Sequence, residues 1–440
     1  MSYVSCCSEL DELYGSLDPG TIMLIEGPSG VGKTVFTLSL VHRNCSKGYK
    51  ALYLVFNETP EKLLMISTSL GKDLKPFLAK KSLKIVRIPM LRDIDLIEFI
   101  TKIVSEGMEE YDIIVIDSIT PLIKLLRDHV GKRAWLQSTL YEIASRSRGL
   151  LILVADILQS DDPDLKLLEY VSDIVIEFRY RSEEDVIERY MVFRKFRGRE
   201  ISLSMIPFDI SSSGIVVLNY VSREWIKKRK PIIMKIDCEP LKKIIPEVID
   251  PGTSVFLVDR TRELGGTYFH RWLHRKTLEL IEKGYRIAFL CLNPKYIAML
   301  KKGLERKELL DRVYIKYLNP LALNPYVVVR EEIRICKEFD TDIIFVLDIE
   351  RIYHRYSQSR NQLYKYTLYS ISTLKDMNVT AIRLFNLDKQ STIPDEFLDW
   401  SDIVIEIQRD RYGDLVLIPL KSIKREKSVP IRDLDLATCI

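Results

Sequence analysis

The chain contains an internal repeat whose period is about half its length. Five short sequences recur in the same order, each between 228 and 236 residues further along. They are Asp-Pro-Gly-Thr at 18–21 and 250–253, Lys-Gly-Tyr at 47–49 and 283–285, Asp-Ile-Ile at 112–114 and 342–344, Thr-Leu-Tyr at 139–141 and 367–369, and Ser-Asp-Ile-Val-Ile-Glu at 172–177 and 401–406. Solenoid repeats are only about 20–50 residues long, so this spacing predicts two tandem domains of similar fold.

The first half alternates apolar, β-rich runs with segments of helical spacing. The expected buried strands are 21–26, 50–56, 83–88, 113–116 and 150–155, and the expected helices include 93–105 and 132–148. This alternation predicts a mainly parallel, twisted sheet flanked by helices. Further strands at short intervals predict an antiparallel extension, at 173–178, 190–196, 201–210 and 214–218.

The expected fold class is therefore α/β, with a first domain at residues 1–222 and a second at residues 232–440. A basic, proline-terminated stretch, 223–231, lies between them and is interpreted as a linker. Contact with nucleic acid or with an acidic surface is the alternative. The chain has 66 basic and 62 acidic residues, and a net charge of +4 is too small to indicate a polyanion-binding protein by itself.

Composition disfavours several other classes. No apolar run approaches the roughly 20 residues that cross a bilayer, and the first residues lack the pattern of a signal peptide. The seven cysteines are odd in number, and no Cys-x-x-Cys pair is present. That pattern disfavours a zinc ribbon and a disulfide scaffold, so we expect a cytoplasmic protein that does not associate with membranes.

The most specific motif is Gly-x-x-x-x-Gly-Lys-Thr, between an expected strand and an expected helix. The residues expected to bind phosphate are Gly27, Pro28, Ser29, Gly30, Val31, Gly32, Lys33 and Thr34. Glycines allow backbone N–H groups to point at a phosphate, and the helix N-terminus adds partial positive charge. Lys33 is expected to reach the β- and γ-phosphates, and Thr34 to bind Mg²⁺ through its hydroxyl. The motif predicts ATP and Mg²⁺ as cofactors.

Two carboxylates follow neighbouring strands and are candidates to complete this site. Asp117 ends an apolar strand and is expected to hold the Mg²⁺ hydration shell; a buried structural aspartate is the alternative. Glu58 follows the strand at 50–56 and is expected to polarise the attacking water as a general base. The alternative for Glu58 is a helix-capping acid before Pro60.

These motifs, with Leu-Asp-Glu-Leu at 10–13 and Lys-Phe-Arg-Gly at 195–198, resemble the KaiC-like branch of the RecA superfamily, in the broad KaiC/GvpD group and with an archaeal character. The resemblance implies two tandem RecA-like domains and a homo-oligomer, a hexameric ring with ATP between subunits. It also implies that Lys195 and Arg197 reach the neighbouring subunit's nucleotide, where cations stabilise the transferring phosphoryl. An exposed basic strand face is the alternative for this pair. Family members often carry two adjacent acids where this chain has Asn57 and Glu58, so we expect slow hydrolysis.

The second half keeps the repeat but lacks the phosphate motif. In the corresponding segment, 259–267, no lysine precedes Thr267, and the pair at 293–294 that matches Glu58 is Asn-Pro. Asp348 is interpreted as the counterpart of Asp117. We expect a degenerate RecA-like domain without a Walker A motif, used for packing, oligomerisation or partner binding.

Three functions fit a chain of this kind. They are a regulatory or signalling ATPase whose nucleotide state controls assembly or partner docking, a recombinase- or helicase-like motor on single-stranded DNA, and a scaffold that binds ATP structurally. The loop at 159–164 carries three carboxylates, which would repel a phosphate backbone. An earlier loop leaves DNA contact open through its basic residues, Lys124, Arg127, Lys132 and Arg133. We expect the regulatory ATPase, with the DNA-acting motor as the alternative.

Overall fold

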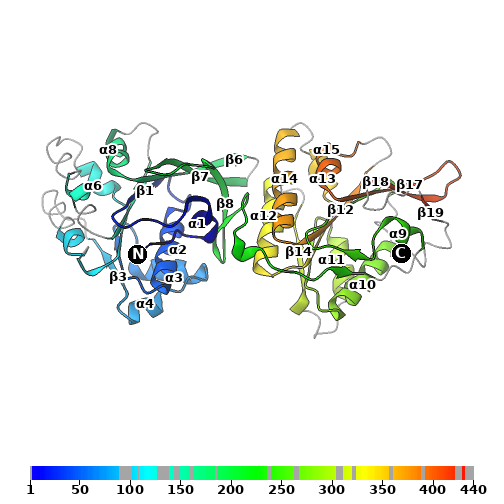
Figure 1. Ribbon diagram of the computed structural model, residues 1–440, viewed down its shortest axis with the longest axis horizontal. Helices are drawn as coiled ribbons and strands as arrows, with labels where there is room; N and C mark the ends of the chain where they lie inside the picture. Colours follow the sequence, from blue (N-terminus) through cyan, green and yellow to red (C-terminus); the bar gives the residue numbers. More distant parts are fainter. Residues whose placement is uncertain are drawn as a thin grey trace. The chain divides into compact units, whose positions relative to one another are not determined.

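The computed structural model describes residues 2–88, 102–107, 109–125, 138–142, 149–157, 163–183, 186–234, 239–261, 267–303, 311–319, 324–355, 360–387, 392–421 and 429–431. The chain divides into two compact units, Met1–Glu183 with Ile187–Val217, and Glu184–Val186 with Leu218–Ile440. Each unit contains one large sheet flanked by helices (Figure 1). Most of the helices expected at 93–105 and 132–148, and residues 159–162 of the expected acidic loop, lie outside the described residues. The domain limits at 222 and 232 stay a prediction.

The sheet of the first unit has the strand order β3-β2-β4-β5-β1-β6-β7-β8-β9. Its strands are β1 (Ile22–Gly27), β2 (Ala51–Val55), β3 (Leu83–Arg87), β4 (Ile113–Asp117), β5 (Leu150–Asp156), β6 (Ile174–Glu183), β7 (Val186–Phe196), β8 (Met205–Ser211) and β9 (Gly214–Val217). Its helices are α1 (Ser8–Tyr14), α2 (Lys33–Ser46), α3 (Pro60–Ser69), α4 (Lys75–Ala79), α6 (Thr120–Leu125) and α8 (Pro163–Val171). The pairings from β3 to β6 are parallel, and β8 pairs antiparallel with both β7 and β9. The expected antiparallel extension is present, although its third strand begins at Met205 rather than at 201.

Burial explains why the central strands are visible in the sequence. Every residue of β1 and β2 is buried, and β4 and β5 are buried up to their last residue. Parallel strands covered by helices on both faces need apolar side chains on both faces, so they form continuous apolar runs. Polar residues are then confined to the strand ends, where the P-loop and Asp117 lie.

The second unit repeats this topology in an eight-stranded sheet with the order β14-β13-β15-β16-β12-β17-β18-β19. Its strands are β12 (Ser254–Asp259), β13 (Ile287–Cys291), β14 (Val313–Tyr317), β15 (Ile343–Leu347), β16 (Thr380–Asn386), β17 (Ile403–Arg409), β18 (Leu415–Lys421) and β19 (Val429–Ile431), with a separate pair β10 (Ile232–Ile233) and β11 (Val248–Ile249). Its helices are η1 (Arg223–Trp225), α9 (Glu239–Ile244), α10 (Thr267–Glu282), α11 (Pro294–Gly303), α12 (Pro325–Glu338), α13 (Glu350–Arg355), α14 (Arg360–Asp376) and α15 (Asp395–Trp400). In both sheets the six parallel strands follow the same order, so the expected α/β fold class is confirmed and is consistent with two tandem RecA-like domains.

Strand registers assign counterparts between the two units and correct one expectation. Val55 is the last residue of β2 and lies opposite Asp117 in the first sheet. Cys291 is the last residue of β13, the corresponding strand of the second sheet, and lies opposite Leu347. Leu347 is therefore the counterpart of Asp117. The interpretation of Asp348 as that counterpart is wrong, because Asp348 comes one residue later, after β15 has ended.

The expected linker makes ion pairs within the second unit. The Arg229 side chain is 6% exposed and pairs with Asp340 at 3.0 Å and with Asp342 at 2.6 Å. Lys227 pairs with Asp340 at 2.8 Å. Part of the basic character of this stretch is therefore neutralised by acids of its own chain. In the described part of the chain, no helix is both long and apolar enough to cross a membrane.

Candidate nucleotide site

The Walker A motif forms a loop between β1 and α2. Gly27 and Gly32 have φ angles of 151° and 119°, and a Cβ at Gly27 would lie 2.4 Å from the carbonyl oxygen of Phe178. A side chain is therefore excluded at Gly27 by contact as well as by conformation. Gly32 precedes the first turn of α2 and gives it no side-chain cap, so the N–H groups of that turn stay available to an anion.

Lys33 is buried beneath this loop, with 6% of its side chain exposed. Its Nζ donates to the carbonyl oxygens of Gly27 at 2.7 Å and Pro28 at 2.8 Å. It also forms an ion pair with Asp156 Oδ1 at 2.9 Å. Asp156 ends β5 and lies opposite Gly27 in the sheet. Sequence reasoning missed Asp156, although a polar residue directly after an expected buried strand was an available signal.

Thr34 and Asp117, the two residues expected to bind metal, lie together. Thr34 Oγ1 donates to Asp117 Oδ2 at 2.9 Å. Burial raises the pKa of Asp117, and hydrogen bonds from Tyr53 and Thr34 and the charge of Lys33 act in the opposite direction. A hydroxyl and a carboxylate are ligands that Mg²⁺ accepts, usually with several waters retained. These residues therefore fit a magnesium ion at the end of β4.

Glu58 lies apart from this cluster. Its carboxylate is 37% exposed and pairs with Lys62 at 2.6 Å. Within the described residues, no contact joins Glu58 to Lys33, Thr34 or Asp117. The cap of α3 is Thr59, whose side chain accepts from the N–H of Lys62, so Glu58 is not the capping residue.

Lys195 and Arg197 lie at the opposite edge of the sheet from the P-loop of their own chain. Lys195 Nζ donates to the carbonyl oxygens of Glu169 and Tyr170 at the end of α8, at 2.9 and 3.2 Å. Arg197 pairs at 2.8 Å with Asp173, whose carboxylate accepts from the N–H of Ile22 at the start of β1. β1 spans about 17 Å from Ile22 to the P-loop. Lys195 and Arg197 therefore contact α8 and Asp173 rather than the P-loop of their own chain.

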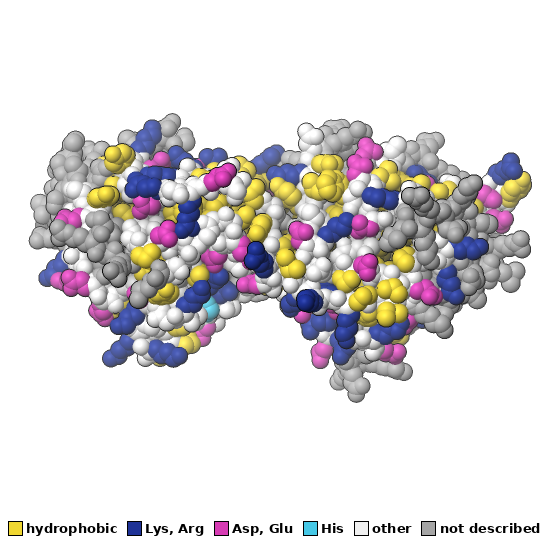
Figure 2. Space-filling view, in the orientation of Figure 1, with side chains coloured by type: hydrophobic (Ala, Val, Ile, Leu, Met, Phe, Trp, Pro, Cys, Tyr) yellow, Lys and Arg dark blue, Asp and Glu magenta, His cyan; other side chains and the backbone are white. Residues whose placement is uncertain are grey.

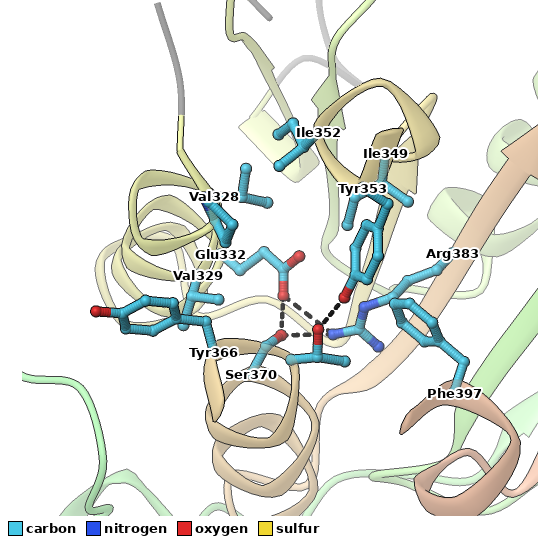
Figure 3. A pocket seen from close by; sticks show the side chains of 12 residues that line it. Val328, Val329, Glu332, Ile349, Ile352, Tyr353, Tyr366, Ser370, Arg383 and Phe397 are labelled. Atoms are coloured by element: carbon cyan, nitrogen blue, oxygen red, sulfur yellow. Dashed lines mark hydrogen bonds and ion pairs between the residues drawn. The ribbon is translucent and has the colours of Figure 1, made fainter. Parts of the chain in front are cut away.

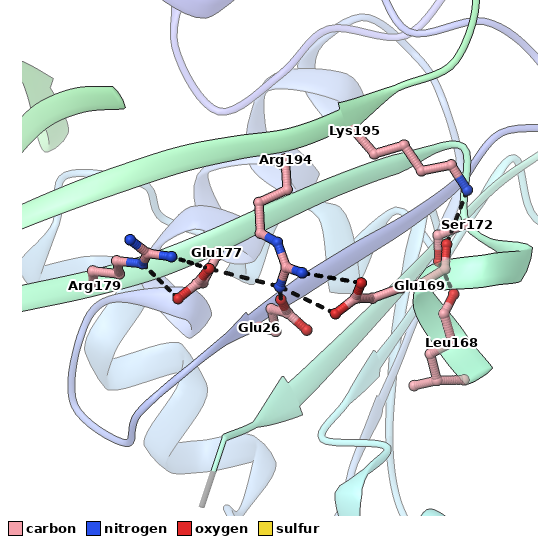
Figure 4. A network of polar contacts seen from close by, with 8 residues as sticks. All are labelled: Glu26, Leu168, Glu169, Ser172, Glu177, Arg179, Arg194 and Lys195. Carbon is pink, nitrogen blue, oxygen red and sulfur yellow. Dashed lines mark hydrogen bonds and ion pairs between the residues drawn. The ribbon is translucent and has the colours of Figure 1, made fainter. Parts of the chain in front are cut away.

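A buried carboxylate directly precedes the P-loop (Figure 4). Glu26 is 1% exposed and accepts from Arg194 at 2.7 Å. Arg194 also contacts Glu169 and Glu177. Burial, and then the neighbouring carboxylates, raise the pKa of Glu26 to about 7. The sequence signal was a glutamate at the end of an otherwise apolar strand.

The corresponding edge of the second sheet is built differently. By register, Asp259 replaces Gly27 and Asn386 replaces Asp156. Asn386 donates to Asp348 Oδ1 at 2.7 Å. Burial, and then Asp348, raise the pKa of Glu350 to about 7. Among the described residues, no group of three His, Cys, Asp or Glu side chains is arranged to hold a metal ion.

The second unit instead has a small pocket between α12, α13, α14 and β16 (Figure 3). Glu332 and Arg383 form a buried ion pair there at 3.0 Å, and Ser370 bonds to both. In the second sheet Arg383 of β16 lies opposite Val346 of β15. At the corresponding position of the first sheet, Leu153 of β5 lies opposite Ile116 of β4. Arg383 therefore replaces a core leucine, and this pair belongs to the packing of the second domain.

Comparison with known proteins agrees with this geometry. Residues 5–222 match a family model described as ATPase: KaiC. A UPF0273 protein of Thermotoga maritima is 23% identical over 228 residues, which cover 47% of this chain and 92% of that protein. Circadian clock protein KaiC2 of Synechocystis is 27% identical over 50% of this chain and 41% of its own length. DNA repair protein RadA of Rickettsia typhi is 26% identical over 51% of this chain and 48% of its own length. The chain thus spans less than half of the KaiC2 and RadA proteins it matches. The first half of this chain is a RecA-like P-loop ATPase domain of the KaiC family.

Proposed function

We propose that this chain binds MgATP at the P-loop of its first domain and hydrolyses it slowly, and that nucleotide state controls its assembly or its docking to a protein partner. The observation that carries this proposal is the convergence of Lys33, Thr34 and Asp117 beside a glycine loop at a helix N-terminus. Membership of the KaiC family supports nucleotide binding.

In this proposal different residues of the first domain bind the phosphates and the magnesium ion. Backbone N–H groups of 27–34 hold the phosphates, and Lys33 supplies positive charge to them. Thr34 and Asp117 hold the magnesium ion, which neutralises charge on the phosphates when bound. Lys33 shares its charge with Asp156, so phosphate binding competes with this ion pair.

Hydrolysis requires groups that lie outside this cluster. Glu58 has to leave Lys62 to act as a general base on water, which is consistent with slow turnover. Lys195 and Arg197 act on a nucleotide only in a neighbouring subunit, as a hexameric ring provides. In such a ring, the second domain contributes packing, subunit contacts or a partner-binding surface.

Mutation separates these roles. Glu58→Gln is expected to bind ATP with unchanged affinity and to lose turnover. Arg197→Ala and Lys33→Ala, each inactive alone, are expected to recover part of the turnover when mixed rings form. Equal turnover in the wild type and Glu58→Gln would remove Glu58 from its role, and no recovery in verified mixed rings would remove Arg197.

A motor acting on single-stranded DNA is the second candidate, because RadA is among the similar proteins. The visible face in Figure 2 has Lys and Arg side chains interspersed with Asp and Glu rather than a continuous basic surface. Since DNA affinity depends on phosphate neutralisation, this mixture favours the regulatory ATPase. Filter binding to single-stranded DNA across a salt series distinguishes the two, and tight, steeply salt-dependent binding would favour the motor.

A further inference from the structure

The Asp117 carboxylate is held by a hydrogen-bonded ring that includes a buried tyrosine. Tyr53, in the middle of β2, is 0% exposed, and its hydroxyl donates to Asp117 Oδ2 at 2.7 Å. Thr37 Oγ1 lies 2.8 Å from the Tyr53 hydroxyl and 3.0 Å from the carbonyl oxygen of Thr34. Thr34 Oγ1 closes the ring by donating to the same Asp117 oxygen at 2.9 Å.

Counting protons fixes the direction of the two bonds to Asp117. A carboxylate only accepts, so the single proton of the Tyr53 hydroxyl is used on Asp117. The Thr37 hydroxyl also has one proton, which the carbonyl oxygen of Thr34 and the hydroxyl oxygen of Tyr53 share as acceptors. Tyr53 and Thr34 both bond to Oδ2, and neither bonds to Oδ1. The ring thus fixes the orientation of Asp117 and leaves Oδ1 to the metal shell.

The second domain provides an internal control for the Tyr53 hydroxyl. Register places Tyr53 opposite Val115 in the first sheet and Phe289 opposite Phe345 in the second, so Phe289 is the counterpart of Tyr53. Phe289 is also fully buried and stacks on Phe345 with ring centroids 5.0 Å apart. The fold thus accepts a ring without a hydroxyl here. The hydroxyl occurs in the domain that has Asp117, and it is absent where Leu347 replaces that carboxylate.

We propose that Tyr53 is a positioning residue of the nucleotide site, whose hydroxyl orients the Asp117 carboxylate for the magnesium ion of MgATP. The role rests on the proposed function of the first domain. Partners of this kind, one step removed from the metal, typically change metal affinity or activity by about 10–100-fold. Because Thr34 also holds Asp117, we expect the lower end of that range.

The test measures the magnesium dependence of ATP binding by the full chain. Tyr53→Phe is expected to raise the Mg²⁺ concentration for half-maximal MgATP binding about tenfold. Its affinity for ATP in EDTA is expected to stay within about twofold of the wild type, because the P-loop backbone and Lys33 are unchanged. Mn²⁺ binding in the presence of a non-hydrolysable nucleotide, followed by electron paramagnetic resonance, gives the same comparison without turnover.

Tyr14→Phe is the matched control. Tyr14 is also buried in the first domain, and its hydroxyl donates to the carbonyl oxygen of Leu203. This variant loses a buried hydroxyl bond but is expected to keep the wild-type magnesium dependence. If Tyr53→Phe fails to fold, Thr37→Val decides. It removes the hydroxyl that contacts both Tyr53 and the carbonyl oxygen of Thr34, and it should shift the magnesium dependence in the same direction by a smaller factor.

Each outcome has one meaning. Wild-type magnesium dependence in folded Tyr53→Phe, or in Thr37→Val where that variant decides, would overturn the positioning role and leave the proposed function intact. An equal shift in Tyr14→Phe would also overturn it, since loss of stability would then explain the effect. A wild-type chain without magnesium-dependent nucleotide binding would overturn the proposed function, and the role of Tyr53 with it.

Discussion

The carboxyl edges of the two sheets have the same topology and different chemistry. In the first domain this edge carries Asp117, which is held by Tyr53 and Thr34. In the second domain the counterparts of Asp117 and Tyr53 are Leu347 and Phe289, and both are buried. The sheet therefore forms without the charged and hydroxyl groups of the site, which supports a role for those groups in nucleotide binding rather than in folding.

One polar link survives at both edges with its direction reversed. In the first domain Ser118 Oγ donates to Asp156 Oδ2 at 3.0 Å. In the second, Asn386 Nδ2 donates to Asp348 Oδ1 at 2.7 Å. Each bond joins the residue directly after one strand, β4 or β15, to the last residue of the next strand, β5 or β16. This link holds neighbouring strand ends together, and it does not require a nucleotide.

Removing Lys33 should have the largest effect on ATP affinity, because it makes the carboxyl edge of the first sheet resemble that of the second. Lys33→Ala deletes the buried cation that contacts Gly27, Pro28 and Asp156. A loss of ATP affinity of about 100-fold is expected, because charge-assisted bonds to phosphate are among the strongest in proteins. Isothermal titration calorimetry measures it, with the exposed Lys75→Ala as control. Retained affinity in Lys33→Ala would place the nucleotide elsewhere.

Changing Asp156 to the residue found in the second domain should act in the opposite direction. Asp156→Asn removes the carboxylate that competes with phosphate for Lys33, and the amide oxygen still accepts from Ser118. ATP affinity should therefore rise, by about three- to tenfold for one competing charge of moderate exposure. The same titration checks this, and weaker binding would indicate that Asp156 contacts the nucleotide or its metal directly.

Glu26 makes the stability of the first domain depend on pH at a position where the second domain has Val258 by register. The folded protein binds a proton at Glu26 more tightly than the unfolded chain does, since the pKa is raised from 4.5 to about 7. This contribution is full below the unfolded pKa and is lost as pH rises through about 7. Glu26→Gln should remove that loss, worth about 2 kcal/mol between about pH 5.5 and 8.

Urea unfolding of the first domain across that range measures the effect. The Gln side chain keeps an acceptor for Arg194, and Glu61→Gln, on an exposed part of α3, is the control. If the free energy of unfolding changes with pH equally in the wild type and Glu26→Gln, the prediction is wrong.

A change at the second edge should have the smallest effect on nucleotide binding. Asp348→Asn is expected to leave ATP affinity within about twofold of the wild type, because Asp348 lies at the position of Ser118 rather than of Asp117. Calorimetry on the full chain checks this. A large loss of affinity would mean that the second edge takes part in nucleotide binding.

Much of this organisation could be predicted from the sequence. The repeat is visible in short sequences that recur in order. The buried parallel strands are visible because both faces of each strand are apolar. The Walker A motif identifies Lys33 and Thr34, and the end of an apolar strand identifies Asp117. Tyr53 was missed because a tyrosine in an apolar strand looks like an ordinary core residue. Asp348 was misassigned because it is the first carboxylate after an apolar strand, although the repeat at 112–114 and 342–344 aligns position 117 with Leu347.

The contacts of Lys195, Arg197 and Glu58 could not be predicted from the sequence either. Lys195 bonds to α8 and Arg197 pairs with Asp173. These partners are more than 20 residues away in the sequence, so local sequence patterns do not identify them. Glu58 pairs with Lys62, and this contact depends on where α3 begins. Their roles therefore remain proposals, and they depend on a neighbouring subunit or on movement of a side chain.

We propose that the first of the two domains has a nucleotide site and that the second has none. The most direct test is the stoichiometry of MgATP binding to the full chain by equilibrium dialysis or calorimetry. We predict one ATP per chain for the wild type and Asp348→Asn, and none for Lys33→Ala at the same concentrations. Two ATP per chain would show a second site, and one ATP remaining on Lys33→Ala would show that the P-loop is not the site.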